Sequence, residues 1–181
     1  MKILIASDIH GSAYYCEKIV EAFEREGADK LLLLGDVLYH GPRNDLPRDY
    51  DPKRVSAMLN AIKEKIICVK GNCDSEVDQM VLEFPIMAPY AIIAFEKRVI
   101  FATHGHTYNV DQPPFLNKCD VLLYGHFHVP RCEEHEGFIY MNPGSVSIPK
   151  ENSQHSYMVT DGDNFVWKNT DGEPYMEKHL G

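Results

Sequence analysis

The sequence has no apolar run long enough to cross a membrane, and its five cysteines form no Cys-x-x-C pair. Residues Met1 to Ala6 make too short an apolar stretch for an export signal, and Asp8 soon interrupts it. We therefore expect a cytoplasmic protein that does not associate with membranes. Its cysteines are expected to be reduced thiols, and they are Cys16, Cys68, Cys73, Cys119 and Cys132.

Basic residues are also scarce, because 18 Lys and Arg stand against 27 Asp and Glu and give a formal net charge of -9. Binding to a nucleic-acid polymer needs clustered Lys and Arg, so we expect no such partner. The 44% hydrophobic content is ordinary for a globular chain, and 181 residues suit one compact domain with a core. Without a repeat or a linker, residues 1–181 are predicted to form a single domain.

The first half of the chain alternates strand and helix patterns. Ser12 can cap a helix that ends at Gly27, and Asp51 followed by Pro52 can begin a second one. Strand-helix-strand alternation predicts a parallel sheet with right-handed crossovers. The buried strands expected here are Lys2–Ala6, Lys30–Leu34 and Ile66–Val69.

The second half is typical of short strands joined by turns. A long loop separates the second strand from the second helix, over residues 38–51, and long loops in compact domains are often functional. The strands predicted in the second half are Ala91–Phe95, Arg98–Ala102, Asp120–Tyr124, Phe138–Met141, Tyr157–Thr160 and Phe165–Lys168. Together the two halves indicate an α/β protein.

Polar side chains recur where the apolar runs end. Because the carboxyl ends of parallel strands line the ligand crevice of an open sheet, five separate strand ends direct Asp, Asn and His toward one region. These segments are Ser7-Asp8-Ile9-His10, Gly35-Asp36, Gly71-Asn72-Cys73-Asp74, Thr103-His104-Gly105-His106 and Tyr124-Gly125-His126-Phe127-His128.

The residue types at these ends suit a pair of metal ions. Carboxylate oxygens and imidazole nitrogens bind Zn, Mn, Fe or Ni, and the absence of thiolate-rich spacing argues against a structural zinc site. A carboxylate such as Asp36 can bridge two ions about 3.5–4 Å apart. Any one motif alone is more often a cap, a turn or a buried hydrogen-bonding pair. The convergence of five such motifs favours the metal site.

The same ordered motifs resemble those of the calcineurin-like metallophosphoesterase superfamily. Asn142-Pro143-Gly144-Ser145 resembles its small single-domain branch, and the segments after Gly35 and Gly71 are similar to the YfcE-type bacterial phosphodiesterases. The resemblance implies a four-layer αββα sandwich with two divalent ions at one edge. The family commonly works with Mn²⁺, and Zn²⁺, Ni²⁺, Fe²⁺ or Co²⁺ can substitute.

The resemblance also implies how the ligands are shared. The first ion would be held by Asp8, His10, Asp36 and His128. The second would be held by Asp36, Asn72, His104 and His126. The expected reaction is hydrolysis of a small or activated phosphodiester by a metal-bound hydroxide, because two cations lower the pKa of bound water toward about 7. An edge strand near the C-terminus leaves a homo-oligomer, dimer or tetramer, as an open possibility.

Two residues bear on protonation of the leaving group. Cys73 stands where many relatives have His, and a thiol with a pKa of about 8.5 is a poor proton donor to an alkoxide. Cys73 is interpreted first as a small packing residue, which favours esters with good leaving groups. His106 either supplies part of the missing role or only supports the metal ligands.

The loop after Asp36 contains two candidate substrate-binding residues, His40 and Arg43. A guanidinium there can bind a phosphate oxygen bidentately, and the alternative for Arg43 is a solvated loop cation. Two other functions are considered. A phosphomonoesterase or protein phosphatase is disfavoured by Cys73, and a non-catalytic scaffold of the same fold is disfavoured by the complete ligand set.

Overall fold

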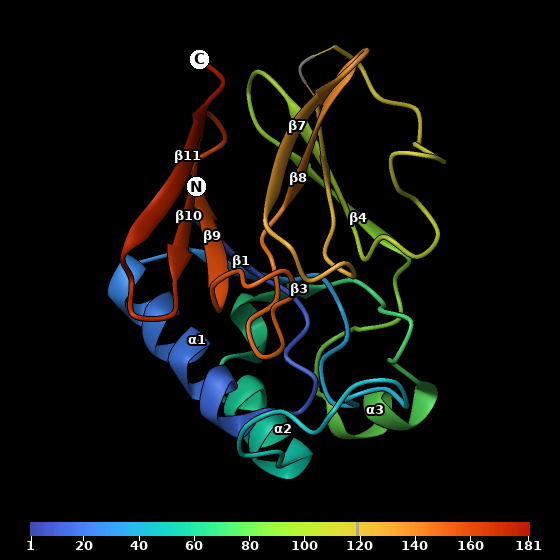
Figure 1. Ribbon diagram of the computed structural model, residues 1–181, viewed down its shortest axis with the longest axis vertical. Helices are drawn as coiled ribbons and strands as arrows, with labels where there is room; N and C mark the ends of the chain where they lie inside the picture. The colour runs from blue at the N-terminus through green and yellow to red at the C-terminus, as the bar shows by residue number, and fades with distance from the viewer. Residues whose placement is uncertain (119) are drawn as a thin grey trace.

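The computed structural model describes residues 1–118 and 120–181 and contains two facing β-sheets with helices against one of them (Figure 1). Cys119 lies outside the described residues. The helices are α1 (Ala13–Glu26), α2 (Pro52–Ala61) and α3 (Glu76–Val81), with a short 3-10 turn at Lys63–Lys65. The strands are β1 (Ile3–Ala6), β2 (Lys30–Leu33), β3 (Ile66–Cys68), β4 (Tyr90–Ala94), β5 (Val99–Thr103), β6 (Asp120–Leu123), β7 (Arg131–His135), β8 (Phe138–Asn142), β9 (Ser156–Thr160), β10 (Asn164–Asn169) and β11 (Pro174–His179).

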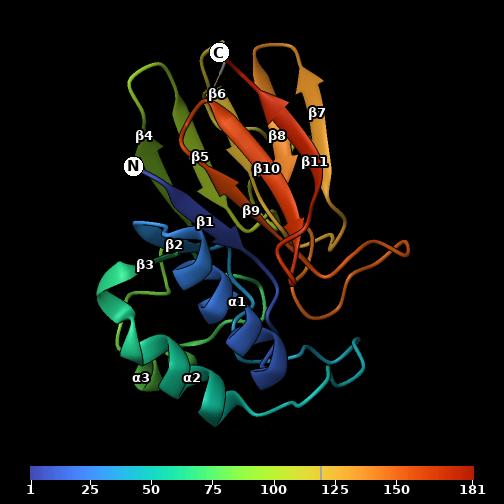
Figure 2. The same ribbon diagram turned by 90° about the vertical axis from the view of Figure 1, so that its left-hand side faces the viewer.

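The first sheet has the strand order β11-β10-β9-β1-β2-β3, and the second has the order β4-β5-β6-β8-β7. Strands β1, β2 and β3 run parallel to one another, as predicted from the alternation of strand and helix. In the second sheet β5, β6 and β8 are parallel, while β4 and β7 pair antiparallel at its edges. Within each sheet the parallel strands therefore end at the same edge, and the two edges meet where Asp8, after β1, contacts His128, after β6. Figure 2 shows the two sheets packed face to face.

The helix caps follow the sequence expectations. The Ser12 side chain accepts a hydrogen bond from the Tyr15 amide, and Gly27 ends α1 in the left-handed conformation with φ 60°. Asp51 caps α2, with Pro52 in its first turn. The apolar face of α1 packs against the first sheet and α2, in a core that includes Cys16, Ile19 and Leu59.

A second core fills the space between the sheets. Ile3 and Ile5 of β1 point into this inter-sheet core, whereas Leu4 points to the opposite face, toward the helices. Successive side chains of a strand alternate between its two faces, and both faces of β1 are covered. Phe165 and Trp167 are fully buried in the inter-sheet core. The Trp167 indole donates to the backbone carbonyl of Asn142 at 2.7 Å and so joins the two sheets.

The resemblance predicted a four-layer αββα sandwich, and the α/β fold with two facing sheets is confirmed. In the described residues the helices cover the first sheet only (Figure 1). The outer face of the second sheet packs Phe101 and Tyr124 against Tyr108, Val110 and other residues of a segment that contains no helix in its described part, residues 105–118. The loop at 38–51 is also confirmed. None of the helices in the described chain has the length and apolar character needed to span a bilayer.

Candidate metal centre

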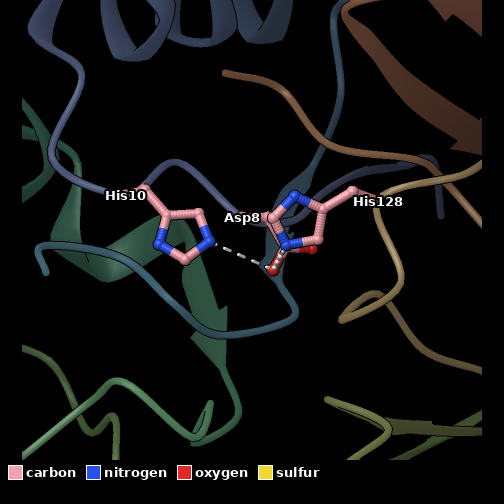
Figure 3. Close-up of side chains that lie close together, drawn as sticks. All are labelled: Asp8, His10 and His128. Carbon is pink, nitrogen blue, oxygen red and sulfur yellow. Dashed lines mark ion pairs between the residues drawn. The ribbon is translucent and has the colours of Figure 1, made fainter. Parts of the chain in front are cut away.

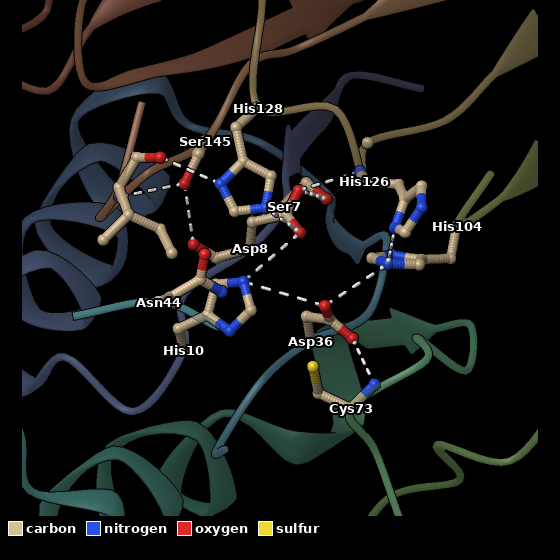
Figure 4. Close-up of polar contacts among 12 residues, drawn as sticks. Ser7, Asp8, His10, Asp36, Asn44, Cys73, His104, His126, His128 and Ser145 are labelled. Carbon is tan, nitrogen blue, oxygen red and sulfur yellow. Dashed lines mark hydrogen bonds and ion pairs between the residues drawn. The ribbon is translucent and has the colours of Figure 1, made fainter. Parts of the chain in front are cut away.

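The predicted ligands converge at the edge where both sets of parallel strands end (Figure 4). Asp8 and His10 follow β1, Asp36 follows β2 and Asn72 follows β3, all in the first sheet. His104 follows β5, and His126 and His128 follow β6, in the second sheet. Asp8, His10, Asp36, His104 and His128 are buried, with exposed fractions of 3% or less. The structure thus places these predicted side chains at one edge of the two sheets.

One group of ligand atoms surrounds Asp8 (Figure 3). Its Oδ1 atom lies 3.6 Å from Nε2 of His10 and 3.3 Å from Nε2 of His128. Its Oδ2 atom accepts hydrogen bonds from the Ser7 hydroxyl at 2.6 Å and from the His126 amide at 3.1 Å. One carboxylate oxygen is therefore held by the protein, and the other faces the two imidazoles.

Asp36 lies between this group and a second one. Its Oδ2 is 3.7 Å from Nε2 of His10 and 3.4 Å from Nε2 of His104. Its Oδ1 accepts a hydrogen bond from the Cys73 amide at 2.8 Å. The His104 Nε2 also lies 3.0 Å from the Asn72 side-chain oxygen and 3.2 Å from Nδ1 of His126. Asp36 is thus the residue that contacts both groups.

Three imidazoles are oriented by backbone carbonyls. The Nδ1 atoms of His10, His104 and His128 lie 2.8, 2.6 and 2.8 Å from the carbonyl oxygens of Tyr39, Leu34 and Ile148 respectively. Donation of the Nδ1 proton to these carbonyls leaves the Nε2 lone pairs directed at Asp8 and Asp36. This is the arrangement by which proteins present neutral histidines to a metal ion.

The two buried carboxylates, Asp8 and Asp36, favour positive charge on the groups around them. Burial disfavours the charged form, yet the nearby imidazoles of His10 and His128 hold the pKa of Asp8 well below its usual value. Burial also disfavours the His104 imidazolium, but its hydrogen bond to Asp36 and the charges of both carboxylates raise the pKa of His104 to about 9. Burial and the charge on His104 lower the pKa of His126 to about 4.

The donor set fits divalent transition metal ions. Two buried atoms at its centre, Oδ1 of Asp8 and Nε2 of His10, have no hydrogen-bond partner. Buried polar atoms without partners are costly, and a cation satisfies them. Three sets of ligand atoms lie within 4.8 Å of one another, and they are Asp8, His10 and His128; Asp8, Asp36 and His104; and His10, Asp36 and Cys73. Oxygen and nitrogen donors of this kind suit Mn, Fe, Ni, Co or Zn.

The backbone around the ligands is held in an unfavourable conformation. Five of the predicted ligands have left-handed φ values, which are 58° for Asp8, 50° for His10, 54° for Asp36, 63° for His126 and 62° for His128. Each such non-glycine residue costs on the order of 1–3 kcal/mol. No sequence pattern predicts these left-handed conformations. Such strain persists only where surrounding contacts maintain it, and it is common at functional sites.

Several neighbouring residues supply those contacts. The hydroxyls of Ser145 and Ser147 both donate to the Asp8 carbonyl, at 3.0 and 2.9 Å. The Asn142 side-chain amide donates to the Gly125 carbonyl at 2.8 Å. Asn142 and Ser145 belong to the Asn-Pro-Gly-Ser motif that the sequence showed, whereas Ser7 and Ser147 stand in no motif that marks them as supporting residues.

Asp74 connects two of the ligand-bearing segments. Its carboxylate accepts hydrogen bonds from the amides of Asp36, Val37 and Gly71, at 2.8, 2.9 and 2.7 Å. Asp74 immediately precedes α3 but is not the residue that caps it. Ser75 is the cap of α3, with a reciprocal pair of hydrogen bonds to Asp78. Asp74 instead orients the backbone that carries Asp36.

A cavity of about 350 Å³ opens beside the ligands, with Asp36, Asn72, Cys73 and Arg43 in its lining. The same lining includes Lys150, which sequence reasoning did not single out and which has no motif around it. Of the other predicted residues, His40 does not line this cavity but packs edge-on against Tyr50, with ring centroids 5.3 Å apart. His106 lies at the exposed rim, 5.4 Å from the His104 ring.

The Cys73 thiol is half-buried beside the carboxylates. Burial and the negative charge of Asp36 raise the pKa of Cys73 to about 12. The thiol therefore stays neutral and is a poor acid at physiological pH. Cys16, Cys68, Cys73 and Cys132 are all free thiols in the described chain.

The fold and this cluster define a phosphoesterase centre, and comparison with known families agrees. Residues 1–164 match the family model for the calcineurin-like phosphoesterase superfamily domain. The chain belongs to this family, as the motifs indicated.

Within the family, the chain is similar to phosphodiesterase YfcE of Escherichia coli strain K12. The two are 51% identical over 163 residues, which cover 90% of this chain and 89% of YfcE. A solved structure of E. coli YfcE, described as a phosphoesterase, superposes over the full length of both chains with a TM-score of 0.97 and 46% identity. Phosphodiesterase MJ0936 of Methanocaldococcus jannaschii is more distant, at 26% identity over 80% of this chain and 83% of its own.

Proposed function

We propose that the protein is a metal-dependent phosphodiesterase that hydrolyses small or activated phosphodiesters at a centre with two divalent ions. The observation that carries this proposal is the pair of unpartnered buried atoms, Asp8 Oδ1 and His10 Nε2, within a cluster whose imidazoles are oriented by backbone carbonyls. The similarity to a phosphodiesterase over most of both chains supports the choice of a diester.

The geometry suggests how two ions would share the ligands. Asp8, His10 and His128 would hold one ion, and Asn72, His104 and His126 would hold the other. Asp36 would bridge them, because its Oδ2 faces His10 on one side and His104 on the other. When bound, such ions supply positive charge to the phosphate and lower the pKa of water. Mn²⁺ is the ion that we propose, on the family resemblance.

The residues of the chain would orient and bind the substrate. Arg43 and Lys150 line the cavity beside Asp36 and place two cations where a phosphodiester anion would enter. Because the chain has a net charge of -9, attraction of an anionic substrate would depend on these two local cations. The same net charge disfavours a nucleic-acid polymer as substrate. The neutral Cys73 thiol would leave the departing alcohol without a strong proton donor. Substrates with acidic leaving alcohols should therefore react best.

The proposal is tested with purified protein freed of metal by chelation and then supplied with Mn²⁺, Co²⁺, Ni²⁺ or Zn²⁺. We expect bis(4-nitrophenyl) phosphate to be hydrolysed in a metal-dependent way and 4-nitrophenyl phosphate to be a poorer substrate. Elemental analysis of the protein should find two ions per chain at saturation. Preference for the monoester would contradict the proposal, and an inert protein with every metal would indicate a scaffold.

A further inference from the structure

An apolar groove adjoins the phosphate cavity and shares the Cys73 side chain with it. The groove has a volume of about 560 Å³, within the range of small-molecule sites. It lies between α2, α3 and the loop after Asp36. Its apolar lining consists of Leu38, Tyr39, Tyr50, Val77 and Val81.

Several large apolar side chains of the groove are exposed to solvent. Tyr39 is 41% exposed, Val77 is 68% exposed and Val81 is 50% exposed. Large apolar side chains that gather at one place on a surface often mark a ligand site. Here they gather beside a cavity that already has the chemistry for a phosphate.

Some polar groups in the lining are already hydrogen-bonded within the protein. The Ser75 hydroxyl and amide both donate to the Asp78 carboxylate, at 3.0 and 2.9 Å. The Ser56 hydroxyl donates to the Lys53 carbonyl at 2.9 Å. An aromatic or aliphatic group bound there would bury apolar surface. The exposed Lys53 adds a cation at the mouth, which suits an anionic ester.

Two residues that line the groove also contact predicted metal ligands through backbone hydrogen bonds. The carbonyl of Tyr39 lies 2.8 Å from Nδ1 of His10, so the residue that forms one wall also orients a predicted ligand. On the other side, the Cys73 amide donates to Asp36. A phosphate bound beside Asp36 would thus place one of its ester substituents next to Cys73 at the entrance of the groove.

We propose that this groove is the subsite for the leaving group and selects phosphodiesters whose departing alcohol is aromatic. This inference rests on the proposed phosphodiesterase function and names its substrate class. Two features agree on that class: the apolar wall accepts an aryl ring, and the side chain shared by the groove and the phosphate cavity is a thiol. A thiol is a weak hydrogen-bond donor, which favours an alcohol that departs without protonation. A phenolate meets both conditions, because its charge is delocalised over the ring that the groove would bind.

The test compares two diesters whose leaving alcohols have similar acidity but different shape: methyl 4-chlorophenyl phosphate and methyl hexafluoroisopropyl phosphate. Wild-type protein with Mn²⁺ should show a kcat/KM about tenfold higher for the aryl ester, since a hydrophobic pocket discriminates by about 10–200-fold per missing group. The V77S/V81S variant should reduce this ratio by about fivefold. Both substitutions are on the exposed face of α3, where Ser has a helix propensity close to that of Val.

The matched control is Met80→Ser, because Met80 is 83% exposed on the same helix and does not line the groove. It should leave the wild-type ratio unchanged. Methyl-selective NMR of the metal-free protein gives a readout without turnover: methyl 4-chlorophenyl phosphate should shift the methyl signals of Val77 and Val81.

The outcomes separate the subsite from the proposed function. If wild-type protein hydrolyses neither diester and also fails with bis(4-nitrophenyl) phosphate, the phosphodiesterase function is wrong. If it hydrolyses bis(4-nitrophenyl) phosphate but neither diester, the leaving-group subsite is wrong. If it hydrolyses both with a ratio near one, or if V77S/V81S keeps the wild-type ratio, the leaving-group subsite is wrong. A second copy of this chain is the competing occupant of the groove. Light scattering that shows a smaller assembly for V77S/V81S than for wild type would overturn the subsite in favour of that copy.

Discussion

The Nε2 atom of His128 lies 3.3 Å from Oδ1 of Asp8, although the two residues follow strands of different sheets. Asp8 follows β1 of the first sheet, and His128 follows β6 of the second. The candidate metal centre therefore exists only when the two sheets are packed together. Bound ions would stabilise that packing, and loss of the packing would disperse the ligands.

Metal removal should accordingly lower the thermal stability of the protein. A ligand present at 100 times its Kd stabilises the folded state by about 2.7 kcal/mol. For a chain of this size, that corresponds to a Tm decrease of roughly 5–10 °C when the ion is removed. Differential scanning calorimetry before and after chelation measures the change. Equal Tm values with and without Mn²⁺ would argue against binding at this site.

The Asp36→Ala substitution should abolish metal binding and activity together, because Asp36 faces both groups of ligand atoms. We expect the activity to fall by more than about 100-fold, which exceeds the usual effect of a residue that only supports a ligand. Elemental analysis and diester hydrolysis measure the two losses. Asp45→Ala is the control, because Asp45 is exposed in the nearby loop. Retained turnover in Asp36→Ala would refute the bridging role.

The Cys73→His substitution should extend hydrolysis to esters with less acidic leaving alcohols. An imidazole can protonate the departing oxygen, whereas the Cys73 thiol, with its pKa raised to about 12, cannot do so effectively. The measurement is the dependence of kcat/KM on leaving-group pKa, which should become shallower. Cys73→Ser is the matched control and should retain the steep dependence of wild type. The same slope in Cys73→His would mean that residue 73 has no part in leaving-group departure.

Removal of both hydroxyls that hold the Asp8 carbonyl should weaken metal binding. The S145A/S147A variant leaves this carbonyl without its two serine donors, while Asp8 keeps its left-handed backbone. We expect the metal Kd to rise about 10–100-fold, as for other groups that orient a ligand. Calorimetric titration with Mn²⁺ measures the Kd. Ser56→Ala is the control, since that hydroxyl bonds only within α2. An unchanged Kd would show that other contacts suffice to position Asp8.

Glu26 offers a prediction of pH dependence away from the metal centre. Burial opposes its ionisation, but hydrogen bonds from Lys168 and Tyr157 lower the pKa of Glu26 below its usual value. Because the folded pKa is lower than the unfolded one, the stabilisation is complete above the unfolded pKa of about 4.3 and is lost as pH falls through the folded pKa. Glu26→Gln should therefore reduce the free energy of unfolding at pH 7 and have little effect in strong acid.

Denaturant unfolding of wild type and Glu26→Gln at several pH values measures this difference. Glu24→Gln is the control, because Glu24 is exposed on the same helix and should change stability little at any pH. A Glu26→Gln effect that is equally large at pH 7 and in strong acid would show that the charge on Glu26 is not the cause.

The elements that sequence patterns predicted are those with buried faces. The strand at Ile3–Ala6 is a continuous apolar run, and α1 has both a cap and an apolar stripe. Two strands escaped prediction. β7 reads Arg-Cys-Glu-Glu-His and β11 begins with Pro174, so neither shows the apolar alternation of a half-buried strand. Both lie at sheet edges, where backbone pairing with β8 and β10 forms the strand and where charges are tolerated.

The candidate site divides in a similar way. The convergence of Asp8, Asp36 and His104 followed from the rule that parallel strands end together. The orientation of each imidazole did not follow, because the backbone carbonyls of Leu34, Tyr39 and Ile148 carry no residue-specific signal. The groove beside Cys73 was also absent from the predictions. It depends on how α3 and the loop after Asp36 pack in space.

The glycines beside the carboxylates determine where this enzyme fold can vary. A β-carbon on Gly71 would lie 2.1 Å from Oδ1 of Asp36, and one on Gly125 would lie 1.9 Å from the Ser7 hydroxyl. The carboxylates thus occupy the room that any other side chain would need, and neither glycine can be replaced without displacing a ligand. Mutant libraries intended to alter substrate preference should keep both glycines and vary Val77 and Val81. These two side chains are exposed in the groove and can change in size without displacing a metal ligand.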